Sequence, residues 1–306
     1  MFRCNIWTRT RNDKVGDSMQ QISSFNDHQS GSLYLVPTPI GNLDDMTFRA
    51  IKTLKEVDLI AAEDTRHTQQ LLNHFDISTR QISFHEHNTE QRVPELIEKL
   101  KAGYSIAQCS DAGMPSISDP GKELVAAAVR EGLPVIPLPG ANAGLTALIA
   151  SGLVPQPFYF FGFLERKHQQ QVMALEQLKE RKETMIFYEA PHRLKKTLAT
   201  MAEVFGDERR VVLARELTKR YEEFTRGTLA EVTAWFADHQ PRGEFVILVA
   251  GNEHPTEKTD NEIELPLTEQ VDKEILNGLS TNAAIKLVAK KNNIKRQELY
   301  KQYHQL

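Results

Sequence analysis

From Leu33 onward, short apolar runs alternate with segments whose apolar residues recur every three or four positions. The runs have the length of β-strands, and the intervening segments have the periodicity of amphipathic helices. Regular alternation of this kind predicts a largely parallel sheet with helices on both faces. The predicted strands are Leu33–Val36, Val57–Ala62, Ser105–Cys109 and Val135–Leu138, and the predicted helices are Asp45–Lys55, Thr68–Phe75, Gln91–Lys101, Lys122–Glu131 and Ala143–Ser151.

A second series of the same kind follows Pro155-Gln-Pro157, where the two prolines indicate a hinge. The chain is therefore expected to form two α/β domains with a ligand cleft between them. The predicted strands of the second series are Phe158–Phe163, Met185–Tyr188, Val211–Ala214 and Phe245–Val249, and its predicted helices are Gln169–Glu180, Arg193–Phe205 and Leu229–Asp238.

The two ends of the chain lack this alternation. Residues 1–31 are polar, show no apolar periodicity and contain no signal-peptide segment, so a disordered tail is expected there. The predicted domains are then 32–154 and 155–251, followed by a polar, acidic linker at 252–264 and a small helical module at 265–306. The helices expected in the module are Thr268–Leu276, Thr281–Lys290 and Lys295–Tyr303.

Composition limits the class of protein. A chain of 306 residues has room for about two domains, and no apolar run reaches the roughly 20 residues that span a bilayer. The two cysteines, Cys4 and Cys109, are too few for a disulfide framework or a cysteine metal site, which favours the cytoplasm. A net charge of -4 argues against nonspecific coating of nucleic acid but leaves room for a local basic surface.

The loop Ser110–Gly121 follows a predicted strand and is rich in glycine, proline and hydroxyl side chains. Gly113 and Gly121 permit backbone angles that other residues avoid, and Asp111 and the serines offer hydrogen-bonding groups. The loop stands at the carboxyl end of a strand, where open α/β folds bind ligands. Ligand binding is therefore favoured over the alternative of a plain connection in which Asp119 caps the next helix.

Four further segments bear on chemistry. Val36–Asn42 follows the first strand and lacks the G-x-G-x-x-G pattern of dinucleotide sites. Ala62–His67 holds two acids, an arginine and a histidine at another strand end, a density that favours a functional site over capping and ion pairing. Tyr188–Arg193 repeats this theme in the second domain, and Ala214–Arg220 adds basic groups beside it. Phe84–His87 offers two histidines without a convincing third ligand, so no metal is expected.

The C-terminal module is basic over its last two predicted helices, where a single acid, Glu298, opposes several cations. Two hypotheses stay open for it. The module is either a helix-turn-helix-like unit that contacts phosphates or a packing appendage with a solvated charged face. The basic residues are Lys286, Lys290, Lys291, Lys295, Arg296 and Lys301.

Taken together, the motifs resemble the tetrapyrrole methylase superfamily and, within it, the ribosomal small subunit methyltransferase I family. The resemblance implies that S-adenosylmethionine (SAM) is the methyl donor, bound in the cleft of a homodimer. It also implies 2'-O-methylation of cytidine 1402 in the 16S rRNA of the small ribosomal subunit. The motifs that carry it are Val36–Leu43, Glu63–His67, Ser110–Gly113, Ser118–Gly121, Pro139-Gly140, Phe187–Arg193 and Ala214–Lys219.

The resemblance also places the donor against specific segments of this chain. These are the loop after the first strand, the glycine-rich loop, the turn after Pro139-Gly140 and the second domain. Met114 stands where a small hydroxyl residue is usual in the family. The implied donor-binding residues are Thr38, Pro39, Ile40, Asp111, Ala112, Gly113, Ser116, Ile117, Asn142, Ala143, Glu189 and Leu217.

The chemistry of this transfer is an in-line displacement, which gains from positioning and from a general base that activates the ribose hydroxyl. The candidate catalytic residues are Glu63, Asp64 and His67, and our hypothesis for the base is Asp64 or His67. Arginine and lysine suit phosphate oxygens. The predicted RNA-binding residues are Arg66, Arg193, Lys219, Arg220, Lys290, Lys291, Lys295 and Arg296.

Two hypotheses from other classes remain open. A small-molecule methyltransferase acting on a tetrapyrrole would share the donor site but would need a deep apolar acceptor pocket. A noncatalytic ribosome-assembly factor would bind RNA through the C-terminal module and use the cleft residues only structurally.

Overall fold

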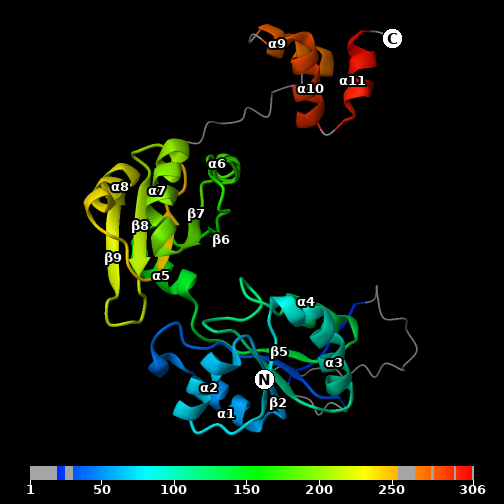
Figure 1. Ribbon diagram of the computed structural model, residues 1–306, viewed down its shortest axis with the longest axis vertical. Helices are drawn as coiled ribbons and strands as arrows, with labels where there is room; N and C mark the ends of the chain where they lie inside the picture. Colours follow the sequence, from blue (N-terminus) through cyan, green and yellow to red (C-terminus); the bar gives the residue numbers. More distant parts are fainter. Residues whose placement is uncertain (1–18, 25–29, 254–265, 277–278, 293, 305–306) are drawn as a thin grey trace, which may run out of the picture. The chain divides into compact units, whose positions relative to one another are not determined.

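The computed structural model describes residues 19–24, 30–253, 266–276, 279–292 and 294–304 (Figure 1). Most of the predicted tail and linker lies outside the described residues. The chain separates after Glu253 into two compact units, which are treated separately below. Within the described residues, no helix is both long and apolar enough to cross a lipid bilayer.

The first sheet is parallel throughout, as the alternation of apolar runs predicted. Its strand order is β3-β2-β4-β1-β5. The sequence pattern missed β3 because only one of its three residues is apolar. The strands are β1 (Leu33–Leu35), β2 (Leu59–Ala62), β3 (Gln81–Ser83), β4 (Ile106–Cys109) and β5 (Val135–Pro137).

Helices cover both faces of this sheet because its strands are apolar on both sides. In β2, Ile60 faces α1 (Phe48–Glu56) and α2 (Thr65–His74), whereas Leu59 faces α3 (Thr89–Lys101) and α4 (Lys122–Arg130). Every residue of β2 and β4 is buried. Figure 1 shows the two helix pairs on opposite sides of the sheet.

The second sheet has the order β6-β7-β10-β8-β9 and differs from the first in direction. Only β6 and β7 run parallel, and the other neighbours are antiparallel. The short connection between β8 and β9 requires a hairpin, because a parallel crossover needs a dozen or more residues. The strands are β6 (Phe158–Phe163), β7 (Thr184–Glu189), β8 (Arg210–Arg215), β9 (Glu223–Thr228) and β10 (Phe245–Val249).

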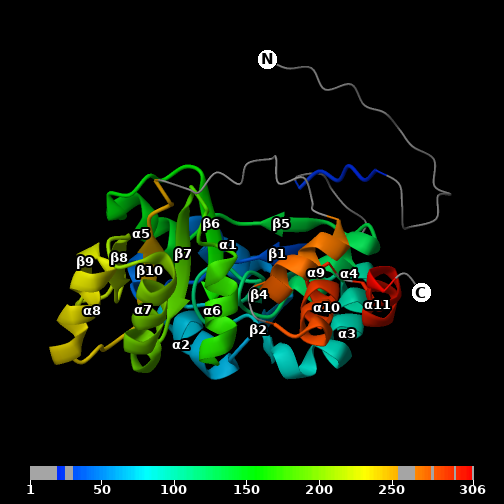
Figure 2. The same ribbon diagram turned by 90° about the horizontal axis from the view of Figure 1, so that it is seen from above.

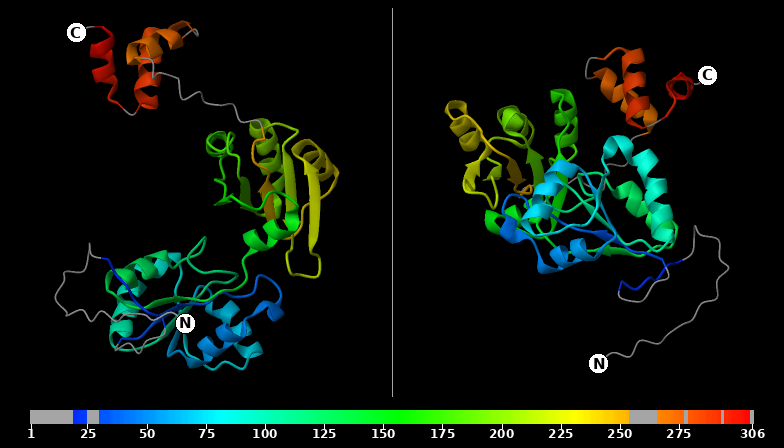
Figure 3. Two further views of the ribbon diagram at one scale, coloured as in Figure 1. Left: turned by 180° about the vertical axis from the view of Figure 1, so that it is seen from behind. Right: turned by 60° about the horizontal axis from the view of Figure 1, so that its bottom comes forward.

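Both faces of the second sheet are also covered, but unequally (Figures 2 and 3). Helices α6 (His168–Glu176), α7 (Pro191–Phe205) and α8 (Leu229–Asp238) pack on one face, around the fully buried Phe187. The other face packs against α5 (Ala143–Ser151). Helix α5 thus joins the second sheet although it precedes the proline hinge at which the sequence places the domain boundary.

The described residues of the C-terminal unit form three short helices, each within one residue of its predicted start and end. They are α9 (Leu267–Leu276), α10 (Thr281–Lys291) and α11 (Arg296–Tyr303). Their shared core is Val271, Ala284, Ile285, Val288, Ala289 and Leu299. A short turn separates α10 from α11, which is the spacing of a helix-turn-helix.

Candidate functional site

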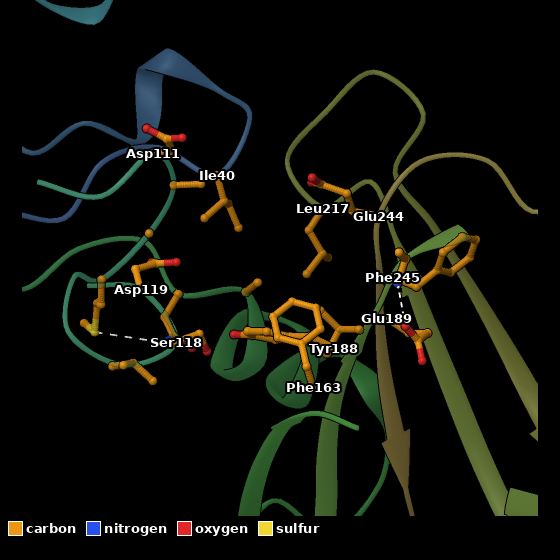
Figure 4. Close-up of a pocket in the computed structure, with 18 of the residues that line it drawn as sticks. Ile40, Asp111, Ser118, Asp119, Phe163, Tyr188, Glu189, Leu217, Glu244 and Phe245 are labelled. Atoms are coloured by element: carbon orange, nitrogen blue, oxygen red, sulfur yellow. Dashed lines mark hydrogen bonds between the residues drawn. The ribbon is translucent and has the colours of Figure 1, made fainter. Parts of the chain in front are cut away.

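A cavity of about 530 Å³ lies where loops from the carboxyl ends of the first sheet face the second sheet (Figure 4). We call it the donor-side cavity. In Figure 4, Asp111 and Asp119 stand on one side, and Leu217 and Phe245 stand opposite them. The first sheet contributes Ile40 after β1, Glu63 after β2, Asp111–Gly113 and Ser118-Asp119 after β4, and Asn142 and Ala143 after β5.

Hydrogen bonds join the loops of the first sheet into one rigid edge. The backbones of Thr38 and Gly113 exchange two bonds of 3.0 Å, and Thr38 Oγ1 donates to the Ser110 carbonyl at 3.1 Å. Asp111 N donates to Glu63 Oε2 at 3.2 Å, and Asp64 N donates to Asp111 Oδ1 at 3.1 Å. The loops after β1, β2 and β4 therefore hold one another in place.

The glycine-rich loop depends on Gly121 for its shape. Its φ of +136° is a conformation that L side chains rarely adopt, and a Cβ there would lie 1.7 Å from Gln108 Nε2. That amide is buried and donates to Ser116 Oγ at 3.2 Å and to the Pro120 carbonyl at 2.8 Å. The loop thus closes on a side chain of β4, and Gly121 leaves the space for it.

Three carboxylates give the donor-side cavity its electrostatic character. Burial raises the pKa of Glu63, and the neighbouring charges of Asp119 and Asp111 raise it further. Burial also raises the pKa of Asp119, and the charge of Asp111 adds to this effect. Among the described residues, no cation pairs with any of the three. The arrangement therefore favours a ligand that carries positive charge.

Asp64 plays a different local role from Glu63. It caps α2 by accepting from Arg66 N at 2.8 Å, and it pairs with Arg66 Nη2 at 2.8 Å. The Arg66 guanidinium holds the pKa of Asp64 well below its usual range. Such a carboxylate is a weak proton acceptor, and Asp64 lines neither cavity described here. His67, the third candidate catalytic residue, lies in a second cavity.

Most of the predicted donor-binding residues line the donor-side cavity. Thr38 and Pro39 instead line the second cavity, and the hydroxyl of Ser116 is bonded to Gln108. Met114 also lines the donor-side cavity, where its sulfur accepts from Asn142 Nδ2 at 3.9 Å. The predicted residues that line it are Ile40, Asp111, Ala112, Gly113, Ile117, Asn142, Ala143, Glu189 and Leu217.

The second sheet adds aromatic side chains that the sequence did not single out as donor-binding, chiefly Phe163, Tyr188 and Phe245. The Tyr188 hydroxyl accepts from Gly144 N at 3.0 Å, and burial raises its pKa. The Tyr188 and Phe163 rings meet edge to face at 5.5 Å. In a sequence, aromatic residues within apolar strands usually indicate a core. The one sequence signal of a ligand site here is that these residues stand at the ends of strands.

Arg193 is engaged inside the protein. Its Nε lies 3.2 Å from Glu189 Oε1, and its Nη2 donates to the Leu164 carbonyl at 2.7 Å. The Glu189 side chain is 1% exposed and also accepts from Thr197 Oγ1 at 2.6 Å. This network fixes the start of α7 beside the cavity. Arg193 could bind RNA, as predicted, only by breaking its bonds to Glu189 and to the Leu164 carbonyl.

Lys219 is paired as well, with Glu216 Oε1 and Glu244 Oε2, each at 3.0 Å. Its alkyl chain packs on the first-sheet loop, since a Cβ on Gly41 would lie 2.4 Å from Lys219 Cγ. The remaining predicted RNA-binding residues are more accessible. Arg66, Arg220, Lys290, Lys295 and Arg296 are exposed, and the side chain of Lys291 lies outside the described part of the chain.

Comparison with known proteins shows the family of the chain. The family profile of Tetrapyrrole (Corrin/Porphyrin) Methylases matches residues 32–233. The chain is 54% identical to "Ribosomal RNA small subunit methyltransferase I" of Streptococcus pyogenes serotype M18, over 94% of this chain and 100% of that protein. The protein of the same name from Bacillus subtilis is 53% identical, over 93% and 98% respectively.

Solved structures share the fold at much lower identity. Uroporphyrin-III-C-methyltransferase from Thermus thermophilus aligns with a TM-score of 0.51 at 20% identity, covering 72% of this chain and 94% of that one. Diphthine synthase aligns with a TM-score of 0.55 at 14% identity, covering 72% and 90%. At these identities the likeness concerns the fold alone.

Substituting Gly121 tests how the glycine-rich loop is held. Gly121→Ala should lower the free energy of unfolding by about 3 kcal/mol, because it adds backbone strain and displaces the Gln108 amide from its acceptors. Gly132→Ala is the matched control, since its φ is +67° and nothing lies within 4 Å of its Cβ position. Gly132→Ala should lower the free energy of unfolding by about 1 kcal/mol, from backbone strain only. If urea unfolding shows the same loss of unfolding free energy in both variants, the contact between Gly121 and Gln108 does not contribute to stability.

Proposed function

The chain belongs to the tetrapyrrole methylase family and, within it, to the ribosomal RNA small subunit methyltransferase I group, and on that premise we propose its reaction. It transfers a methyl group from SAM to the ribose 2'-hydroxyl of cytidine 1402 in 16S rRNA. The observation that carries the proposal is the donor-side cavity. Three carboxylates that have no cationic partner among the described residues line it, on loops of the parallel sheet that hydrogen bonds hold together.

The donor-side cavity suits SAM in size and in charge. Its volume of about 530 Å³ falls in the range of small-molecule sites. Glu63, Asp111 and Asp119 favour a cation, and Ile40 and Leu217 offer apolar contact. When bound, SAM supplies an electrophilic methyl group on a positively charged sulfur. The residues proposed to hold it are those predicted from the sequence that line this cavity, together with Tyr188 and Phe245.

Glu63 becomes our leading candidate for the general base. It lines the donor-side cavity, and its raised pKa makes it a better proton acceptor than Asp64. Asp111 N fixes one of its carboxylate oxygens, which leaves the other for the substrate. The role proposed for Asp64 is to begin α2 and to hold Arg66.

A homodimer is part of the proposal, as the resemblance implies. Two apolar side chains at and after the end of α5, Ile149 and Val154, are 81% and 67% exposed. A self-association surface would bury such residues.

The central experiment incubates the protein with SAM carrying a labelled methyl group and small ribosomal subunits that lack the modification. We expect one labelled methyl per subunit, on the ribose of a single cytidine, as mapped by mass spectrometry of nuclease fragments. Label on a nucleobase would show that the enzyme methylates a base and not the ribose hydroxyl. Label on a tetrapyrrole and none on RNA would support the small-molecule hypothesis, and failure to bind SAM at all would support the assembly factor.

The assignment of the base is tested by Glu63→Gln with Asp64→Asn as the matched control. Glu63→Gln should lower kcat by about 10² to 10⁴-fold, while SAM affinity by calorimetry changes little. Asp64→Asn should keep most of the turnover. Because a base acts when deprotonated, wild-type kcat should rise with pH through the raised Glu63 pKa, and Glu63→Gln should remove that rise. If Asp64→Asn lost more turnover than Glu63→Gln, the general base would be Asp64. If only His67→Ala lost turnover, it would be His67.

We propose that the C-terminal unit contacts RNA phosphates through Lys290, Lys295 and Arg296, which are exposed on or beside α10 and α11. Deleting residues 265–306 should weaken RNA binding and leave SAM affinity intact. The triple alanine variant should make the log–log salt dependence of RNA binding shallower by about 2, since each single-strand phosphate contact contributes about 0.7. Lys273→Ala in α9 is the control, and an unchanged slope in the triple variant would assign the unit a packing role.

A further inference from the structure

The second cavity, of about 210 Å³, lies between the loop after β1 and the first turns of α2. We call it the α2 cavity. The loop contributes Pro39 and Leu43, and the helix contributes His67 and Gln70. Asp111 lines both the α2 cavity and the donor-side cavity, so the two meet at this residue. Three of the residues that the resemblance assigns to the donor, Thr38, Pro39 and Asp111, line this space, whereas Leu43 and Gln70 have no role in that assignment.

The walls of the α2 cavity differ in chemistry. His67 and Gln70 are three residues apart on α2 and so share one face of the helix. Both side chains are exposed, and neither the His67 ring nor the Gln70 amide hydrogen-bonds to any group in the described ranges. Pro39 and Leu43 oppose them with apolar surface, and Leu43 is 41% exposed.

We propose that the α2 cavity holds the acceptor nucleoside, with its base between Leu43 and Gln70 and its ribose toward Asp111. The inference rests on the proposed function and names the acceptor side of that site. Unpaired RNA bases are bound by flat contact on one face and hydrogen bonds at the edge. An apolar wall facing a free amide, which offers both a donor and an acceptor, supplies these two contacts.

The position of the α2 cavity beside the donor-side cavity gives an acceptor a route to the donor. The acceptor oxygen must reach the methyl group from the side opposite the sulfur. A nucleoside in the α2 cavity would enter the donor-side cavity past Asp111, where the two spaces adjoin. A volume of about 210 Å³ has room for a pyrimidine base whose ribose extends toward Asp111, but not for a four-ring macrocycle, which favours RNA as the acceptor.

The test is Gln70→Leu in the full chain, assayed with unmodified small ribosomal subunits and SAM. Losing an edge hydrogen bond should raise the KM for subunits about tenfold, with kcat within about twofold of wild type and SAM affinity unchanged. Leu43→Ala, which removes the apolar wall, should raise the same KM. The KM-against-kcat split separates substrate contact from a general loss of structure.

Gln69→Leu is the matched control on the same helix. Gln69 lies outside the α2 cavity and bonds instead to Asn73 at 2.8 Å and Gln81 at 2.7 Å, so its loss should leave the KM for subunits unchanged. An unchanged KM in both Gln70→Leu and Leu43→Ala, with active wild type, overturns this inference and leaves the proposed function standing. Wild type that methylates no RNA overturns both.

Discussion

The backbone exchange between Thr38 and Gly113 fixes the geometry on which both cavities depend. It joins the loop after β1 to the glycine-rich loop after β4, and the bonds between Asp111 and the Glu63-Asp64 pair add the loop after β2. Residues that are far apart in the chain therefore form one wall. Because each loop is bonded to its neighbour, the carboxylates at this edge are held in place before any ligand arrives.

Local environment separates two adjacent acids that look equivalent in the sequence. Asp64 sits at the start of a helix beside an arginine, and both features favour its charged form. Glu63 is partly buried among other carboxylates, which disfavours its charged form. One residue is thereby suited to structure and the other to proton transfer. Unpaired buried charge costs stability, and a cationic ligand would offset that cost.

The second sheet supplies the opposite wall and keeps its own charges paired. Glu189, Arg193 and Thr197 form a closed network at the start of α7. Lys219 is held between two glutamates while its alkyl chain rests on Gly41. Arg193 and Lys219, the basic groups beside the donor-side cavity, are therefore engaged in contacts within the protein. The predicted phosphate contacts that remain exposed are Arg220, which has no carboxylate partner among the described residues, and Arg66, which pairs with Asp64.

The sequence by itself determined four of the five strands of the first sheet and the helices that follow them, the placing of loops at its carboxyl edge, and the family, because periodicity and contiguous motifs are local properties. Only the tertiary structure decided that α5 joins the second sheet, that β8 and β9 form a hairpin, and that β3 and β9 exist. It also decided which charged residues are paired. Each of these depends on neighbours supplied by distant parts of the chain, and so do the two cavities, which meet at Asp111 and which no single segment encloses.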